Sequence, residues 1–75
     1  MDHNAFLRNI EQILELKSGK LKGDESLESL ESWDSLAVLG FIAMADKNYS
    51  ASVKADDVAA CKIVNDLAAL LEKKK

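Results

Sequence analysis

The sequence holds a single cysteine, Cys61, and a single histidine, His3, and the two stand near opposite ends of a 75-residue chain. A domain of this size has a small core and often depends on disulfides or a structural metal. One thiol cannot close an internal disulfide, and one imidazole does not make a zinc site. We therefore expect no metal site and a fold held by apolar packing, and the unpaired thiol favours a reducing compartment.

Two further features are missing: an apolar run long enough to span a bilayer, and a basic segment followed by an apolar leader. These absences predict a soluble, cytoplasmic protein with no membrane partner. The formal net charge is −3, and the one run of basic residues, Lys73 to Lys75, should complement the negative end of a last helix. Recognition of a nucleic-acid backbone needs a basic face, so we expect no nucleic-acid partner.

Acidic residues gather just ahead of a tryptophan near the middle of the chain. They are Asp24, Glu25, Glu28, Glu31 and Asp34. The same negative field is compatible with a solvated loop and with a docking surface for basic partners, so both interpretations stay open. The tryptophan, Trp33, is expected to anchor this segment to the core.

Apolar residues predict a first helix that begins at Asn4 as its cap and ends near Leu16. The apolar residues that recur every three or four positions, as on one face of a helix, are Phe6, Leu7, Ile10, Ile13 and Leu14. Ser18, Gly19 and Gly23 then bring turn chemistry, and a long connection runs to Trp33. Connections of this length are uncommon and often functional. Its leucines, Leu21, Leu27 and Leu30, should attach it to the core.

Three more helices are predicted after this connection. The second runs from Asp34 to about Asn48 and should turn Leu36, Leu39, Ile42, Ala43 and Ala45 inward. A short third helix spans Ala55 to Ala60, after an inward Val53, and a last helix is capped by Asn65 and carries Leu67, Leu70 and Leu71 inward. Residues 1–75 are thus expected to form one all-α domain. It is a small four-helix bundle of three main helices and a short third, with a long first loop.

The candidate functional residue is Ser35, in the segment Trp33-Asp34-Ser35-Leu36. A phosphate ester on a serine at a helix start would lie in the favourable field of the unpaired backbone N–H groups. Asp34 can cap the helix or steer a cationic partner. The only histidine, His3, is too remote in sequence to suggest a base for Ser35, so Ser35 is expected to be a modified substrate and not a catalytic nucleophile. Cys61 should be a buried structural thiol.

Taken together, these features resemble the acyl carrier protein family over nearly the whole chain. The most specific segments are residues 31–36, with Asp34-Ser35-Leu36, and the tail from Ala55 to Leu67. This tail, with Asp56-Asp57 and Ile63-Val64-Asn65-Asp66, is similar to the family's join between the third and fourth helices. The resemblance implies that a phosphopantetheinyl transferase moves 4′-phosphopantetheine from coenzyme A onto Ser35. It also implies that the thiol of this arm carries acyl groups as thioesters, beside an apolar cleft flanked by the second and third helices.

One part of the second helix departs from the best-known fatty-acid carriers, whose exposed face there is acidic. The matching positions here, expected to be exposed and to bind partners, are Ala37, Gly40, Met44 and Lys47. This change favours a specialised, pathway-dedicated carrier of fatty-acid-like or secondary metabolism. The alternatives are neutral drift of a surface, or a shifted phase in which Met44 belongs to the core.

The resemblance implies a monomer that is not an enzyme. Its expected partners are a phosphopantetheinyl transferase and acyl-activating, acyl-transferring or condensing enzymes. Two other functions remain open at this stage. One is an aminoacyl or peptidyl carrier, because these share the serine and the fold. The other is a helical protein-interaction adaptor without a prosthetic group, in which Ser35 is only a helix-start residue.

Overall fold

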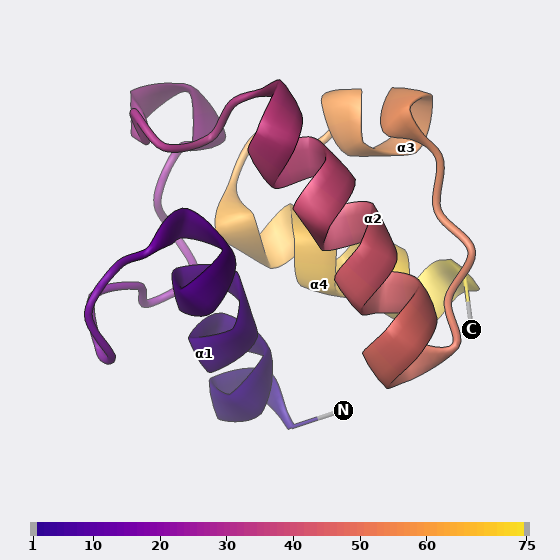
Figure 1. Ribbon diagram of the computed structural model, residues 1–75, viewed down its shortest axis with the longest axis horizontal. Coiled ribbons are helices and arrows are strands. Elements are labelled where there is room, and N and C mark those ends of the chain that lie inside the picture. The colour runs from indigo at the N-terminus through magenta and orange to yellow at the C-terminus, as the bar shows by residue number, and fades with distance from the viewer. Residues whose placement is uncertain (1, 75) are drawn as a thin grey trace.

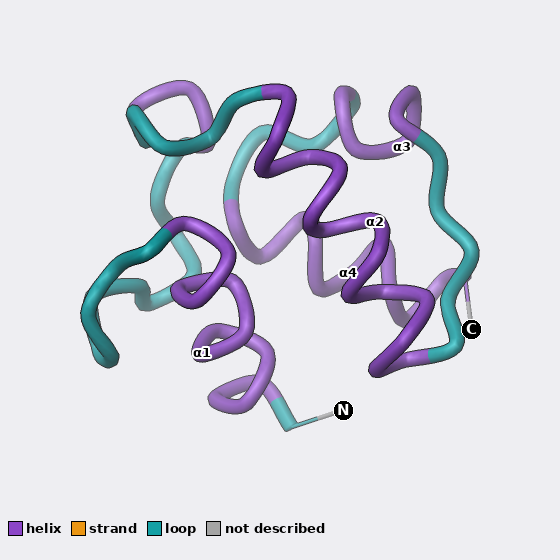
Figure 2. Tube along the Cα trace, in the orientation of Figure 1, coloured by secondary structure: helices purple, strands orange, loops and turns teal. Residues whose placement is uncertain are grey.

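The computed structural model describes residues 2–74 and contains four α-helices in that range. In chain order the elements are α1 (His3–Leu14), the 3-10 turn η1 (Leu27–Ser29), α2 (Ser35–Tyr49), α3 (Ala55–Ala59) and α4 (Val64–Lys74) (Figure 1). Figure 2 shows the connections between them as coil, and residues 2–74 contain no strand. The predicted all-α class is confirmed. None of these helices is both long and apolar enough to cross a membrane.

The start of α1 differs from the prediction by two residues. Asp2 caps the helix, because its Oδ1 accepts hydrogen bonds from the backbone N–H groups of Asn4 at 3.0 Å and Ala5 at 3.3 Å. Asn4, predicted as the cap, is instead the second residue of α1. The helix therefore begins two residues earlier than predicted, and the Asp2 carboxylate accepts N–H groups of its first turn. The helix ends at Leu14, before the predicted end near Leu16, and its C-cap Glu15 adopts the left-handed conformation with φ of 58°.

The segment between α1 and α2 is attached to α1 by Glu11, whose side chain is buried. Glu11 Oε2 accepts a hydrogen bond from the Leu21 backbone N–H at 2.7 Å and from Arg8 Nη2 at 3.1 Å, and Arg8 Nη2 also donates to the Leu21 carbonyl at 3.3 Å. The Arg8 guanidinium forms an ion pair with Glu11. These bonds hold Leu21 in the core, as expected from the sequence.

The same segment is attached at its other end to the turn before α4. The backbone N–H of Leu27 donates to the Lys62 carbonyl at 2.9 Å, and the Asn65 N–H donates to the Gly23 carbonyl at 2.8 Å. Gly23 has a φ of 116°, which strains any other residue, and a Cβ on it would also displace the Asn65 side-chain amide, so glycine is favoured there. Leu27 is buried and Leu30 packs against the core, as predicted.

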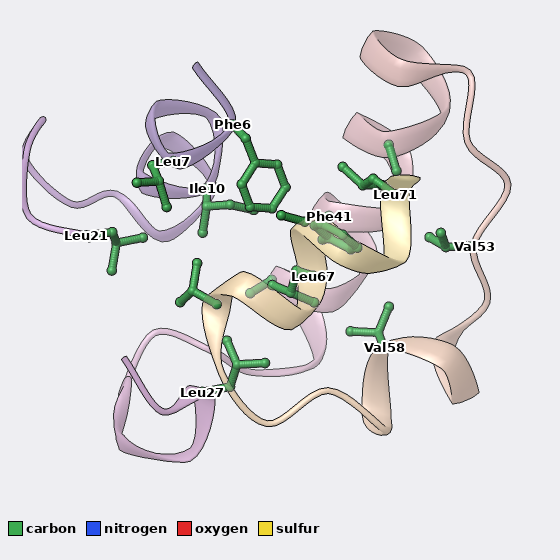
Figure 3. Close-up of a cluster of buried hydrophobic side chains, with 14 of the residues drawn as sticks. Phe6, Leu7, Ile10, Leu21, Leu27, Phe41, Val53, Val58, Leu67 and Leu71 are labelled. Atoms are coloured by element: carbon green, nitrogen blue, oxygen red, sulfur yellow. The ribbon is translucent and has the colours of Figure 1, made fainter. Parts of the chain in front are cut away.

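The core forms where α1, α2 and α4 meet (Figure 3). Figure 3 shows Phe41 of α2 lying among Phe6 of α1 and Leu67 and Leu71 of α4. Phe6 also meets Tyr49 edge to face at 6.4 Å between ring centroids, and Tyr49 accepts a hydrogen bond from Asn9 at 3.1 Å. These contacts join the middle and the C-terminal end of α2 to the rest of the domain.

The C-terminal third of the chain follows the prediction except at one cap. Val53, Leu67 and Leu71 are buried as expected, and Leu70 is half-buried. Asn65, predicted to cap the last helix, lies inside α4, and the free N–H groups of Lys62 and Ile63 are instead accepted by Asp66 Oδ2 at 2.9 and 3.1 Å. Lys73 and Lys74 stand in the last turn of α4, where the helix dipole favours cations, and Lys75 is outside the described residues.

Candidate functional site

Ser35 is the exposed first residue of α2. Asp34 precedes it in extended conformation and caps the helix, with its Oδ1 accepting the Ala37 backbone N–H at 3.0 Å. The capping role predicted for Asp34 is therefore confirmed. Because the cap is provided by Asp34, the hydroxyl of Ser35 is not needed for it and faces solvent as a possible site of modification.

Trp33 anchors the chain immediately before this serine. Its ring meets Phe41 edge to face at 6.3 Å between centroids, and it is half-buried against the core. Its backbone N–H donates to the Leu30 carbonyl at 3.0 Å, and the Asp34 N–H donates to the Ser32 carbonyl at 3.1 Å. The predicted anchoring role is confirmed, and the start of α2 is held by both packing and turn hydrogen bonds.

The burial of α2 differs from the prediction. The helix turns Ala37, Phe41 and Ala45 into the core, whereas Leu36 and Leu39 are 77% and 62% exposed. Leu36, Leu39 and Ala43, all predicted to be inward, are exposed instead. Residues 36–45 are all apolar or glycine, so the hydrophobic pattern did not define one face. The large ring of Phe41, with Ala37 and Ala45 four residues away on either side, was the signal that could have identified the buried face.

The residues predicted to form an exposed partner-binding stripe mostly face inward. Ala37 is 5% exposed, Gly40 is half-buried, and Met44 is half-buried and packs against the core. Lys47 is the one member of the set that is exposed. The expectation of an exposed stripe is therefore wrong for Ala37, Gly40 and Met44, because α2 is rotated to bury Phe41. The absence of acidic residues at these three positions therefore no longer supports the expectation of unusual partner enzymes.

The face of α2 that does meet solvent is formed by Leu36, Leu39 and Ala43, which we call the outer face. Spacings of three and four residues place these side chains together on the helix. Leu36 and Leu39 are the exposed large hydrophobic side chains in the range 2–74. Together they form an exposed apolar patch near Ser35. Sequence reasoning missed this surface because it assigned both leucines to the core.

A groove with a cavity volume of about 440 Å³ opens between the end of α1 and the start of α2. We call it the α1–α2 groove. Its wall includes Asp34 and Leu36, the two chain neighbours of Ser35, and its other lining residues are Ile13, Leu14, Glu15, Ser32, Ala37 and Gly40. The groove was not predicted, because the resemblance implied a cleft between the second and third helices.

A second cavity, of about 540 Å³, lies between the η1 segment and the end of α3, and we call it the α3 cavity. It includes Cys61, which is half-buried and donates a long hydrogen bond from Sγ to the Asp57 carbonyl at 3.6 Å. Burial, followed by the negative charges of Asp66 and Asp57, raises the pKa of the Cys61 thiol. The thiol therefore stays protonated at neutral pH, which disfavours a nucleophilic role.

The remaining titratable candidates do not gather at Ser35. His3 is the first residue of α1 and stacks on Phe6 at 6.3 Å between ring centroids. That end of α1 is at the opposite side of the molecule from the start of α2 (Figure 1). Of the acidic segment, Glu25 is used internally, since it accepts the backbone N–H groups of Lys22 and Gly23, both at 2.8 Å.

The site thus consists of an exposed serine directly after the helix cap and a groove that begins at the two chain neighbours of this serine. Among residues 2–74 no group of three potential metal ligands was found. Comparisons of the chain with protein-family models, with curated proteins and with solved structures gave no match.

Proposed function

We propose that this protein is an acyl carrier, in which Ser35 bears a 4′-phosphopantetheine arm. The observation that carries the proposal is the exposed Ser35 at the first position of α2, capped by Asp34 and bordered by the α1–α2 groove. On this proposal the four helices form a small carrier-type bundle, and residues 15–34 are its long first loop. When bound, the arm supplies a thiol that holds acyl groups as thioesters.

The chain's own contribution to the modification is the Ser35 hydroxyl. Its Oγ forms a bond to the phosphorus that carries the pantetheine part of coenzyme A, and the bond from that phosphorus to the second phosphate breaks. Adenosine 3′,5′-bisphosphate leaves, and the hydroxyl proton passes to a base on the transferase. The external base is needed because the single histidine, His3, is at the opposite side of the molecule.

The outer face supports a carrier that visits several enzymes. Leu36 is next to the serine, and Leu39 and Ala43 continue the same surface along α2. An enzyme that reaches Ser35 therefore meets an apolar surface and can bind by burying it. The partners proposed are the transferase and enzymes that activate, transfer or condense acyl groups in fatty-acid-like or secondary metabolism.

The same exposed leucines also support a second candidate, a protein-interaction adaptor with no prosthetic group. An adaptor would use the outer face in the same way but would have no use for the hydroxyl of Ser35. An aminoacyl or peptidyl carrier would share the modified serine and differ only in its cargo. Attachment of the arm therefore separates the adaptor from both kinds of carrier.

The test is intact mass spectrometry after incubation with coenzyme A and a phosphopantetheinyl transferase of broad specificity. The proposal predicts that the wild-type protein gains one phosphopantetheine and that Ser35→Ala gains none. Ser32→Ala and Ser29→Ala are matched controls, since both serines are exposed and precede α2, and both variants should be modified like the wild type. A wild type that is never modified, or a Ser35→Ala variant that still is, would contradict the proposal.

A further inference from the structure

The outer face of α2 presents apolar side chains to solvent. Leu36 and Leu39 are 77% and 62% exposed, and Ala43 beside them is also exposed. In Figure 1, α2 lies in front of α4, so the face away from α4 is open to a second molecule. Covering these side chains would be favourable, because it removes apolar surface from water. The charges at the two ends of the face indicate which molecule covers it.

The C-terminal end of the outer face carries a cation. Lys47 is exposed and follows Ala43 by four residues, so it continues the line of side chains that begins at Leu36. It stands about three turns after Leu36, or about 16 Å along the helix axis. Within residues 2–74 Lys47 forms no ion pair. Its ammonium group is therefore available to an acidic surface outside this chain.

The N-terminal end of the same face borders carboxylates. Leu36 also forms part of the wall of the α1–α2 groove, and the described residues that line this groove include Glu15 and Asp34 but no lysine or arginine. Neither carboxylate forms an ion pair within residues 2–74. Two carboxylates at one groove create a negative potential that favours a cation. The cavity volume of about 440 Å³ leaves room for an ammonium group and part of its methylene chain.

Opposite charges at its two ends make the outer face complementary to itself in the reverse direction. In a two-fold pair of antiparallel α2 helices, the same surface is used by both copies. With the axis near Leu39, Leu36 of one copy lies over Ala43 of the other, so a large side chain meets a small one and the helices can approach closely. Lys47 then lies beyond Leu36 of the other copy, at the mouth of the α1–α2 groove. The antiparallel helix dipoles favour the same arrangement.

The pairing also has to accommodate Asp46, which is exposed next to Lys47. Successive residues differ by about 100° around a helix, so Asp46 stands on the Leu39 edge of the outer face and Lys47 on the Leu36 edge. A two-fold axis perpendicular to both helices keeps each edge against the same edge of the other copy. The α1–α2 groove opens on the edge of Leu36 and Gly40, so it meets Lys47 and not Asp46.

We infer that the outer face pairs with the outer face of a second copy of this chain, antiparallel, and that Lys47 of each copy enters the α1–α2 groove of the other. A single helix face is smaller than the about 800 Å² per partner that standard stable interfaces bury. The dimer is therefore reversible, with a Kd on the order of 0.1 mM, and dilute protein is monomeric. On the proposed function, the dimer covers Leu36 next to Ser35 and competes with enzymes that reach this serine.

The first test is sedimentation velocity of the wild-type protein at concentrations from about 0.01 to about 1 mM, which bracket the expected Kd. The sedimentation coefficient should rise from that of a monomer towards that of a dimer. Added salt should shift this rise to higher concentration, because the contacts of Lys47 are ionic. A protein that stays monomeric throughout the range would overturn the dimer and leave the outer face to a different protein.

The second test compares Ala43→Glu with Ala69→Glu, which makes the same substitution at an exposed position of α4. Ala43→Glu places a carboxylate against Leu36 of the second copy and should raise the Kd about ten-fold. Ala69→Glu should associate like the wild type. Circular dichroism checks that both variants are folded. The same Kd in the wild type and in both variants would contradict pairing through the outer face.

A charge exchange tests the direction of the pair and the role of the groove. Lys47→Glu and Glu15→Lys should each raise the Kd about five-fold, because each places like charges at both grooves of the dimer. In an equimolar mixture of the two variants, each groove meets an opposite charge, so association should return close to that of the wild type. A mixture that associates no better than either variant alone would place Lys47 outside the groove and overturn the proposed pairing.

These measurements use the unmodified protein and are independent of the arm. If Ala43→Glu does not fold, the charge exchange still tests the pairing, since Glu15 and Lys47 are both exposed. A monomeric wild type would overturn the dimer and leave the carrier function standing. A wild type that dimerises but never gains phosphopantetheine would contradict the carrier function and support the dimer.

Discussion

The two sides of α2 are made of similar residues and have opposite environments. The inner face carries Ala37, Phe41 and Ala45, which are 0–5% exposed, and the outer face carries Leu36 and Leu39, which are 77% and 62% exposed. By hydrophobicity alone the outer face is as well suited to a core as the inner one. The difference lies in shape, because two alanines let α2 approach its neighbours closely around one large ring.

This comparison indicates that one aromatic residue, and not an apolar stripe, determines which face of α2 is buried. Phe41 contributes a large buried surface and an edge-to-face contact with Trp33 at 6.3 Å. The leucines left outside lie near Ser35, where the proposed carrier function requires partner enzymes to bind. An apolar residue that is not needed by the core is therefore available to a second protein.

The variant Phe41→Ala is the strongest test of the difference between the two faces of α2. Removal of a fully buried phenylalanine should lower the free energy of unfolding by about 3–5 kcal/mol, because it removes apolar burial and leaves a cavity. Leu39→Ala, on the outer face, is the matched control and should change it by no more than about 0.5 kcal/mol. Urea denaturation followed by circular dichroism measures both. Similar losses in the two variants would mean that both sides of α2 are packed.

A second experiment concerns Glu11, the buried carboxylate of α1 that holds the segment between α1 and α2. Burial alone would raise the pKa of Glu11, but hydrogen bonds from the Leu21 and Gly19 N–H groups and the charge and hydrogen bonds of Arg8 hold it below its ordinary value of 4.5. A depressed pKa in the folded state means that Glu11 stabilises the fold above about pH 4.5 and that this contribution is lost as the pH falls through the folded pKa.

The corresponding variant is Glu11→Gln, which keeps the shape and removes the charge. It should lower the free energy of unfolding at pH 7 by about 1–3 kcal/mol, because the Arg8 and Leu21 donors lose a charged acceptor. It should also flatten the loss of stability on going from pH 5 to pH 3, which urea titrations at each pH measure. Asp57 and Asp66 titrate in the same direction and are unchanged in the variant, so a pH profile identical to that of the wild type would exclude the role of Glu11.

Much of this fold could be predicted from sequence, and the residues predicted wrongly lie at helix caps and on the faces of α2. The start of α2, the inward Leu21 and Leu27 and the anchoring of Trp33 depend on local chemistry: a cap, turn residues and isolated apolar side chains in a polar segment. Asn4 is not the cap because Asp2 caps an earlier start of α1. Asn65 is not the cap because α4 begins before it, where the Val64 and Asn65 N–H groups donate to the carbonyls of Glu25 and Gly23.

Local sequence signals could not predict which face of α2 is buried, nor the presence of the α1–α2 groove. In a helix that is apolar over ten consecutive positions, the buried face is chosen by what packs against it from α1 and α4. The groove is lined by residues from two helices, among them Ile13 of α1 and Gly40 of α2, which are far apart in sequence. The serine at its edge could be predicted, and the space beside it could not.

Two neighbouring residues of α2, Met44 and Ala43, test the difference between its inner and outer faces. Met44 packs partly against the core and Ala43 is exposed. Met44→Glu should lower the free energy of unfolding by about 1–2 kcal/mol, since a carboxylate would be partly removed from water. Ala43→Glu should change it by no more than about 0.5 kcal/mol. Thermal unfolding of the two variants measures the difference, and equal midpoints would place both residues on the surface.

The smallest effect is expected at the start of α2, where Asp34 and Ser35 are adjacent and differ in role. Asp34→Ala removes the hydrogen bond from the Ala37 N–H and should lower the free energy of unfolding by about 1 kcal/mol. Ser35→Ala should leave it within about 0.5 kcal/mol of the wild type, because the hydroxyl is exposed and the cap remains. Urea denaturation, with both variants measured beside the wild type, resolves this difference.

Function should respond in the reverse order at these two positions. Ser35→Ala removes the only atom proposed to accept the arm, so attachment measured by mass is lost completely although the fold is intact. Asp34→Ala keeps the hydroxyl, so it should still be modified, more slowly if the transferase depends on the capped geometry of α2. A Ser35→Ala variant that unfolds would show instead that Ser35 is a structural residue, and the absence of the arm in that variant would then carry no information about attachment.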